Sequence, residues 1–233
     1  MKRRKPDARV AQAIYNALGN AKSVLNVGAG GGSYEPADRW VTALEPSAEM
    51  IRQRPRGSAH VCQGVAENIP FPDRQFDAVM AVLTVHHWQD VETGLSEMLR
   101  VTRDRLAILT FDPESHYFWL ADYIPEIIDL DQPVMPKMTI FERVLGQTSV
   151  SCVPVHHDCT DGFLGAYWRR PHAYLDPDVR AAISTFAKLG DISFALKKLK
   201  DDLNTGAWEE RYGHLLHKES LDVGYRLIVA SGA

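Results

Sequence analysis

Residues 24–35 read VLNVGAGGGSYE, an apolar run that passes directly into three glycines at alternate positions. The run at 24–27 predicts a short buried strand. Gly28, Gly30 and Gly32 allow backbone angles that other residues avoid, and they let a ligand approach the bare main chain. In open α/β sheets such a loop lies at the carboxyl end of a strand, where nucleotides bind. The stretch therefore predicts a nucleotide-binding loop that follows a strand of a parallel sheet.

A carboxylate, Glu45, ends the next apolar run, which spans residues 41–44. At the tip of a neighbouring strand, a carboxylate can accept hydrogen bonds from both hydroxyls of a ribose. The glycine loop and Glu45 together indicate a cofactor that contains adenosine. A dinucleotide is one alternative, but its fingerprint expects glycine or alanine where this chain has Ser33. The nearby acids Glu35 and Asp38 also suit a pyrophosphate poorly.

A second informative segment, residues 64–79, reads GVAENIPFPDRQFDAV. Pro70 and Pro72 prevent regular structure where the chain must turn. Residues 76–83 then form an almost continuous apolar run, which predicts a strand. That strand leads into TVHHW at residues 84–88. We expect these polar and aromatic side chains at the carboxyl edge of the sheet, beside the cofactor.

The glycine loop, the second segment and the His-His-Trp strand end together resemble the class I, Rossmann-like S-adenosylmethionine (SAM)-dependent methyltransferases. The resemblance is to small-molecule enzymes of the ubiquinone/menaquinone type and covers residues 20–112. It implies a methyltransferase that uses SAM as cofactor and transfers a methyl group to a small-molecule acceptor. It also implies a set of cofactor-binding residues: Asn26, Gly28, Ala29, Gly30, Glu45, Pro46, Ala66, Glu67 and Leu83.

Two positions depart from the family pattern. Asn26 stands where the family usually has an acid beneath the methionine part of the cofactor, and Val65 stands where an Asp usually meets the adenine amine. These departures keep a non-catalytic SAM-binding protein as an alternative. A second alternative is an NAD-dependent oxidoreductase on a similar sheet, which Ser33 and the segment 66–77 disfavour.

The strands expected near Val24, Val41, His60, Ala78 and Ala107 alternate with helices, which predicts a parallel sheet covered on both faces. After about residue 112 the pattern changes. Residues 150–155 and 224–230 are expected strands, and a mainly helical stretch separates them. The predicted fold class is thus α/β, a Rossmann-like class I methyltransferase sheet with a mainly helical C-terminal cap insertion. We expect residues 1–160 with 221–233 to form the SAM-binding domain and 161–220 to form a cap over the substrate.

Methyl transfer from a sulfonium is an in-line displacement, for which proximity and orientation can supply ~7–11 kcal/mol. A base is needed only when the acceptor must lose a proton, and histidine titrates in the right range. His87 is the candidate catalytic residue because it follows the strand that should meet the cofactor's methyl group. The alternative is that one of His86 and His87 packs beneath the sheet edge while the other faces solvent.

Four residues are candidates for contact with the acceptor. Aromatic side chains offer a large rigid surface with a polar tip, and an arginine can hold a carboxylate in a fork. The alternative is that the aromatic residues form the core of the cap and the arginines its solvated face. The candidates are His86, Trp88, Trp168 and Arg169.

The chain has 233 residues, 45% of them hydrophobic, and a formal net charge of −4. The negative charge argues against nucleic acid as a partner, and no apolar stretch reaches the length that spans a membrane. The oligomeric state is not predicted.

The cysteines and histidines indicate neither disulfides nor a metal site. The chain has three cysteines, Cys62, Cys152 and Cys159, an odd number whose spacing does not resemble a disulfide framework. Unpaired cysteines are typical of a reducing compartment, so we expect a cytoplasmic protein. His156 and His157 lie beside Cys159, but adjacent residues of a strand point to opposite faces. A metal site needs three or four converging ligands, so we expect none.

Overall fold

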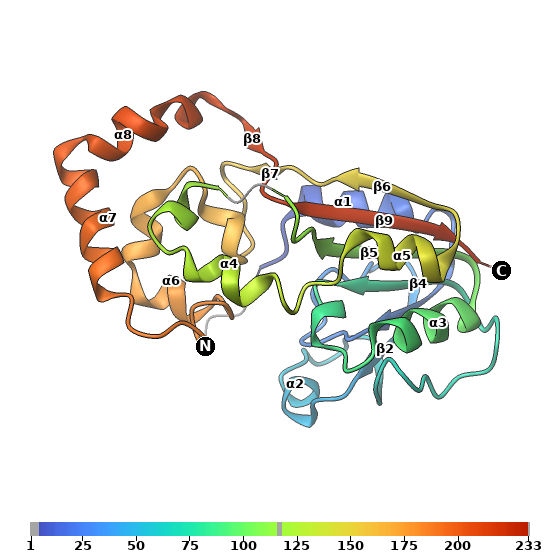
Figure 1. Ribbon diagram of the computed structural model, residues 1–233. Helices are drawn as coiled ribbons and strands as arrows, with labels where there is room; N and C mark the ends of the chain where they lie inside the picture. The colour runs from blue at the N-terminus through green and yellow to red at the C-terminus, as the bar shows by residue number, and fades with distance from the viewer. Residues whose placement is uncertain (1–4, 116–117, 233) are drawn as a thin grey trace. The chain divides into compact units, whose positions relative to one another are not determined.

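The computed structural model describes residues 5–115 and 118–232 (Figure 1). The chain divides into two compact units. The first, here called the sheet unit, contains Ala8–Pro113, Met135–Val153 and the described residues from Tyr225 onward. The second, the helical unit, contains the described residues of Met1–Asp7, Glu114–Val134 and Pro154–Gly224.

The sheet unit is built on a seven-stranded sheet in the order β3-β2-β1-β4-β5-β9-β6. The first five of these pair in parallel, as the alternating pattern predicts. The last strand of the chain, which falls where the sequence predicts a strand over 224–230, inserts antiparallel beside β5. The strands are β1 (Ser23–Val27), β2 (Trp40–Glu45), β3 (His60–Gln63), β4 (Phe76–Val82), β5 (Thr102–Phe111), β6 (Thr148–Cys152) and β9 (Tyr225–Ser231).

The connection from β1 to β2 contains no helix. Residues 28–39, all of them described, form only turns and irregular structure. Parallel neighbours usually need a helical crossover, and in dinucleotide sites the N-terminus of that helix holds the pyrophosphate. This chain makes the crossover without a helix, so side chains rather than a helix terminus must support the glycine loop.

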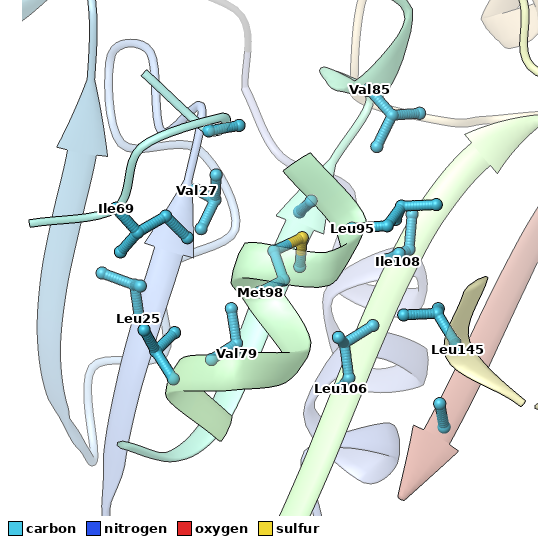
Figure 2. Packing of buried hydrophobic residues seen from close by; sticks show 14 of the residues in the cluster. Leu25, Val27, Ile69, Val79, Val85, Leu95, Met98, Leu106, Ile108 and Leu145 are labelled. Atoms are coloured by element: carbon cyan, nitrogen blue, oxygen red, sulfur yellow. The ribbon is translucent and has the colours of Figure 1, made fainter. Parts of the chain in front are cut away.

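Four helices accompany the sheet: α1 (Ala8–Ala17), α2 (Ala48–Arg52), α3 (Val91–Val101) and α5 (Met138–Leu145). Figure 1 shows α3 and α5 in front of the sheet and α1 behind it. Apolar residues on α3 are spaced so that Leu95 and Met98 face the sheet, and both are fully buried. They pack over Leu25, Val79 and Leu106 (Figure 2). Burial of each such side chain stabilises the fold by about 1.5–3 kcal/mol, so this packing holds α3 firmly on the sheet.

The helical unit is organised around aromatic side chains. Trp119 packs edge-on against Tyr174 and Trp208, with ring centroids 5.5 and 5.3 Å away. Tyr123 and Tyr212 complete the cluster, and all five residues are buried. The unit's elements are η2 (Trp119–Asp122), α4 (Glu126–Asp131), β7 (Val155–His156), η3 (Leu164–Tyr167), η4 (Pro171–Leu175), α6 (Pro177–Ala181), α7 (Ser193–Thr205), α8 (Ala207–Tyr212), η5 (Gly213–His217) and β8 (Ser220–Leu221).

The structure differs from two of the expected boundaries. The helical unit includes Glu114–Val134 as well as the predicted insertion 161–220, because Trp119 donates a hydrogen bond to the carbonyl of Trp168 at 2.6 Å and packs in the same core. The single strand expected over 150–155 is split. Its first part is β6, whereas Val155–His156 pairs with β8 in a separate two-stranded sheet. Pro154 separates the two and cannot donate to a ladder.

Candidate active site

The glycine loop leaves β1 with three left-handed residues. Gly28, Gly30 and Gly32 have φ of 68°, 51° and 86°, which a residue with a side chain adopts only with strain. The N–H groups of Gly28 and Ala29 both donate to the carbonyl of Leu44, at 2.8 and 3.0 Å. These bonds fasten the start of the loop to the tip of β2. All three predicted loop residues, Gly28, Ala29 and Gly30, therefore lie together at the carboxyl edge of the sheet.

Glu45 lies at that edge with a buried carboxylate that is 6% exposed. Its Oε2 accepts the N–H of Gly30 at 2.7 Å, and its Oε1 accepts the N–H of Ser47 at 2.9 Å. A carboxylate has about four acceptor sites, so each oxygen keeps capacity for a further donor. The next residue, Pro46, is exposed, and its carbonyl accepts the side-chain amide of Gln63 at 3.0 Å. This arrangement suits a ligand with two neighbouring hydroxyls.

A buried ion pair supports the other side of the loop. Arg54 Nη2 donates to both carboxylate oxygens of Glu35, each at 2.8 Å. Asn26, on β1 and 2% exposed, donates to Glu35 Oε1 at 3.1 Å. Arg54 Nη1 donates to the carbonyl of Gly30 at 3.1 Å. Sequence reasoning missed Arg54 and used Glu35 only against a pyrophosphate, because no local pattern indicates that these two residues pair.

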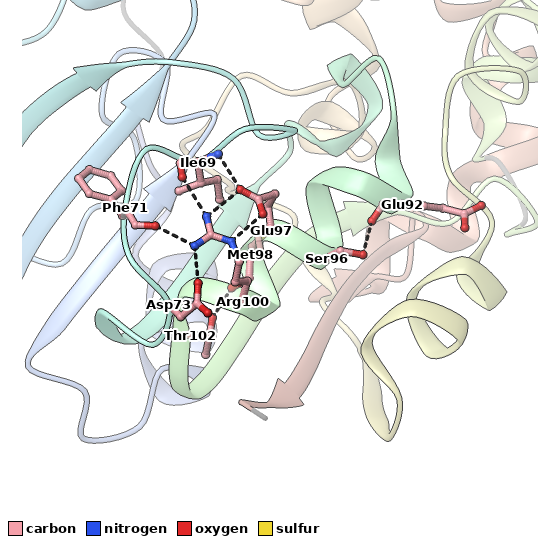
Figure 3. Close-up of polar contacts among 9 residues, drawn as sticks. All are labelled: Ile69, Phe71, Asp73, Glu92, Ser96, Glu97, Met98, Arg100 and Thr102. Carbon is pink, nitrogen blue, oxygen red and sulfur yellow. Dashed lines mark hydrogen bonds and ion pairs between the residues drawn. The ribbon is translucent and has the colours of Figure 1, made fainter.

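The segment after β3 is fastened to α3 by one arginine (Figure 3). Arg100 donates to the carbonyls of Ile69 and Phe71 at 3.0 and 2.8 Å and forms ion pairs with Glu97 and Asp73. Hydrogen bonding to Glu97 is the main cause that raises the pKa of Arg100. These contacts fix the segment that carries the predicted cofactor residues at 66 and 67.

Within that segment, Ala66 is buried at 5% exposed, whereas Val65 is 44% exposed. Glu67 Oε1 accepts the backbone N–H groups of Gln89 and Asp90 at 2.7 and 3.2 Å. Glu67 therefore links this segment to the turn that precedes α3. Its second oxygen is the part of the side chain that these two bonds leave available.

The end of β4 makes a tight turn beside the loop. Leu83 has φ of 53° and donates its N–H to the carbonyl of Leu109 at 2.8 Å. Thr84 follows and is buried, and its Oγ1 lies 2.1 Å from where a Cβ on Gly28 would be. Gly28 is thus required by the packing of the β4 end as well as by its own φ. The turn η1 (Val85–His87) comes next.

The two histidines lie side by side on η1. The ring centroids of His86 and His87 are 4.0 Å apart; His86 is half-buried and His87 is exposed. Trp88 is partly buried and packs on α3, where its ring would lie 2.6 Å from a Cβ on Gly94. The absence of a side chain at Gly94 therefore leaves room for the ring of Trp88.

The other two predicted substrate residues belong to the helical unit. Trp168 is fully buried, and its Nε1 donates to the carbonyl of Val155 at 2.8 Å. Its ring serves the core of that unit and offers no surface to a ligand in this structure, which corrects the expectation for Trp168. Arg169 is half-buried and donates from Nη1 to the carbonyl of Lys218 at 3.1 Å.

The described residues form neither a metal-binding cluster nor a membrane-spanning helix. Across residues 5–115 and 118–232, no three or more His, Cys, Asp or Glu side chains gather as a metal site. No helix in these ranges is long and apolar enough to cross a membrane.

Comparison with known proteins identifies relatives of this chain. A family model described as a methyltransferase domain matches residues 25–108. A putative methyltransferase from an antibiotic biosynthesis pathway of Anabaena variabilis, known from a crystal structure, is 33% identical in sequence to this chain. The structural match has a TM-score of 0.90 and covers 97% of this chain and 98% of that chain.

Curated relatives match over shorter segments. An uncharacterized methyltransferase, YcgJ, of Bacillus subtilis is 30% identical over 47% of this chain and 44% of its own length. The demethylmenaquinone methyltransferase of Streptomyces avermitilis is 34% identical over 48% of this chain and 47% of its own length. This chain thus matches less than half of the length of either relative.

The chain belongs to the SAM-dependent methyltransferases, in their class I, Rossmann-like form, and SAM is the cofactor of that family. The predicted family, fold class and cofactor are confirmed. The residues present fit the cofactor, because the carboxylate of Glu45 keeps free acceptor capacity beside a loop whose glycines leave the main chain bare. When bound, SAM supplies a methyl group on a sulfonium, which makes the group electrophilic.

Proposed function

We propose that this protein transfers a methyl group from SAM to a small-molecule acceptor. The observation that carries the proposal is the buried carboxylate of Glu45, joined to the N–H of Gly30 at the carboxyl edge of the sheet. Ribose hydroxyls can donate to the acceptor sites that Glu45 keeps, while the glycine loop admits the rest of the cofactor. Asn26, Ala29, Pro46, Ala66, Glu67 and Leu83 complete the proposed cofactor site.

In this proposal the protein acts mainly by orientation. Holding an acceptor in line with the methyl group and excluding water supplies the larger part of the rate enhancement. His87 is the proposed base for an acceptor that must lose a proton, because it is exposed on the turn that follows β4. An acceptor that is already nucleophilic, such as a neutral amine, needs no base in the transfer step, and then His87 and His86 contribute contacts only.

We assign acceptor selection to residues 161–220, the predicted cap. The proposed cofactor residues all lie in the sheet unit, and residues 161–220 lie in the helical unit. Arg169 is the proposed contact for an anionic acceptor, since its guanidinium is only half-buried. Arg169→Gln should raise KM for such an acceptor and leave SAM affinity unchanged.

The absent helix after the glycine loop disfavours the dinucleotide alternative, because a pyrophosphate would lack the helix N-terminus that usually holds it. A cytoplasmic location remains part of the proposal and is supported by the three free cysteines, Cys62, Cys152 and Cys159.

Calorimetric titration with SAM, S-adenosylhomocysteine and NAD tests the cofactor. We expect micromolar binding of the first two and none of NAD; binding of NAD alone would overturn the proposal. Transfer of radiolabelled methyl groups to a panel of quinols, fatty acids and phenols then tests turnover. SAM binding without transfer to any acceptor would favour the non-catalytic alternative.

A further inference from the structure

The strand β6 forms one edge of the seven-stranded sheet (Figure 1). Among the described residues it pairs with β9 and with no other strand. Residues 149–152 are all exposed, and Val150 is 49% exposed. An edge strand presents a row of backbone N–H and C=O groups with which another strand can pair, and proteins usually block such an edge with charged side chains, proline, a bulge or covering chain.

The residues of β6 and its flanks provide no such block. Residues 144–157, all of them described, contain no Lys, Arg, Asp or Glu. The pairing with β9 runs in unbroken register from Thr148 opposite Ala230 to Cys152 opposite Arg226, so no bulge twists the edge away. Pro154 comes after the last residue of the strand and does not interrupt it. The edge is therefore open to a further strand along its whole length.

The hydrogen bonds to β9 show which backbone groups of β6 face outward. Val153 donates its N–H to the carbonyl of Tyr225 at 2.9 Å, so Val153 belongs to a hydrogen-bonded pair of this antiparallel ladder. Hydrogen-bonded and non-hydrogen-bonded pairs alternate along such a ladder, so Ser151 and Ser149 also turn their backbone groups toward β9. The residues between them turn their backbone N–H and C=O groups toward the open edge. These residues are Thr148, Val150 and Cys152.

The sequence of β6 is nearly symmetric about Val150. It reads TSVSC, with a serine on either side of Val150 and a small side chain at each end. In a two-fold dimer the same surface meets itself, so a self-complementary strand fits that contact. An antiparallel pair of β6 strands centred on Val150 places Ser149 opposite the partner's Ser151. It places Thr148 opposite the partner's Cys152, so no charges meet and Val150 gains an apolar neighbour.

We propose that β6 is a dimer contact, at which two copies of this chain join their β6 strands antiparallel about a two-fold axis at Val150. The sheet then continues from one subunit into the other. A second copy is the occupant that the strand itself favours, because its outward backbone groups and its uncharged side chains match their own image. The strands β4, β5 and β9 separate β6 from β1 and its glycine loop, so the inference does not depend on the proposed function.

Val150→Pro tests the contact. The N–H of Val150 faces away from β9, so proline there removes a donor from the dimer and none from the β6–β9 ladder. By analytical ultracentrifugation we expect the wild-type protein to form a concentration-dependent dimer. Val150→Pro should raise its dissociation constant by roughly 10- to 100-fold, the range for losing two backbone hydrogen bonds. Val150→Thr keeps the N–H in a β-branched residue and is the matched control, which should dimerise as the wild type does.

A disulfide tests the register and guards against misfolding of the proline variant. In Val150→Cys/Cys152→Ser the two new thiols meet at the axis, where facing Cα atoms of a hydrogen-bonded pair are about 5.5 Å apart, within the range of a disulfide. Mild oxidation should therefore yield covalent dimers on a non-reducing gel. Glu49→Cys/Cys152→Ser carries its new thiol on the exposed side of α2 and should stay unlinked under the same conditions.

Three results would overturn the proposal. The first is a wild-type protein that remains monomeric up to millimolar concentration. The second is a folded Val150→Pro variant, with the melting temperature of the wild type, that dimerises with unchanged affinity, since the dimer would then use another surface. The third is equal linkage in the two cysteine variants, or efficient linkage of the wild type through Cys152, which would place the axis elsewhere.

Discussion

Glu45 and Gly30 are joined by a 2.7 Å hydrogen bond from the glycine N–H to Oε2 of the carboxylate. The bond ties the tip of β2 to the centre of the loop that leaves β1. Because Oε1 of Glu45 also accepts the N–H of Ser47, the carboxylate is held in one orientation before any ligand arrives. Such preorganisation lowers the ordering cost of binding.

Glu45→Ala should weaken binding of both S-adenosylhomocysteine and 5′-methylthioadenosine by about 1–3 kcal/mol, because both ligands carry the ribose that Glu45 is proposed to hold. Calorimetry on the folded variant measures this. Normal affinity in a variant with wild-type circular dichroism would remove Glu45 from the cofactor site.

Gly30→Val should abolish SAM binding. The valine would need φ of 51°, and its side chain would enter the space beside the loop, where the Cβ alone lies 3.4 Å from Cε of Met50. Gly31→Ala is the matched control, because a Cβ there meets nothing within 4 Å. Fluorescence titration should find near-normal SAM affinity for Gly31→Ala. Near-normal SAM affinity in a folded Gly30→Val variant would show that the loop is not the cofactor site.

Arg100→Ala should destabilise the protein by about 2–4 kcal/mol and weaken cofactor binding. Removing Arg100 leaves the carbonyls of Ile69 and Phe71 without their donor and leaves Glu97 with only the N–H of Ile69, so the segment that carries Ala66 and Glu67 loosens. Urea unfolding measures the loss. Arg103→Ala is the control: its ion pair with Asp77 is 3.2 Å long with a half-exposed guanidinium, so it should cost under about 1 kcal/mol. Similar costs for the two variants would contradict this account.

Local patterns were sufficient to predict the sheet and the position of the glycine loop and Glu45 at its carboxyl edge. The glycines directly follow the apolar strand β1, and Glu45 is the last residue of the apolar strand β2. The local sequence is therefore enough to indicate where they lie. A helix start is also local: Asp176 caps α6 by accepting the N–H of Asp178 at 2.8 Å, and Pro177 is its first residue. In each case the neighbours along the chain decide the geometry.

The features that the sequence did not predict depend on contacts between residues that are distant along the chain. Arg54 reaches Glu35 because residues 28–39 form no helix, and no local pattern announces that absence. Trp168 looks like a ligand contact beside its arginines, yet it is buried by contacts with Trp119 and Val155 that are distant in sequence. Aromatic residues serve cores and binding sites equally well, so only their tertiary partners distinguish the two uses.

The stability of the protein should depend on the ionisation of Asp131, at the end of α4. This carboxyl is 9% exposed, and burial raises its pKa from 3.8 to about 6, although the charge of Lys188 opposes the shift. In the folded protein Asp131 therefore binds its proton more tightly than in the unfolded chain. Its contribution to the free energy of unfolding is complete below about pH 3.8. As the pH rises to about 6, up to about 3 kcal/mol is lost.

Asp131→Asn removes that titration and should therefore raise the free energy of unfolding at pH 7.5 while changing it little at pH 4. Urea unfolding of the variant and the wild type at both pH values measures the difference, and comparison at each pH cancels the other titrating groups. Asp129→Asn changes an exposed carboxylate on the same helix and should leave the pH dependence as it is in the wild type. If Asp131→Asn destabilises the protein at pH 7.5, the buried carboxylate has a stabilising partner and its raised pKa is not the dominant effect.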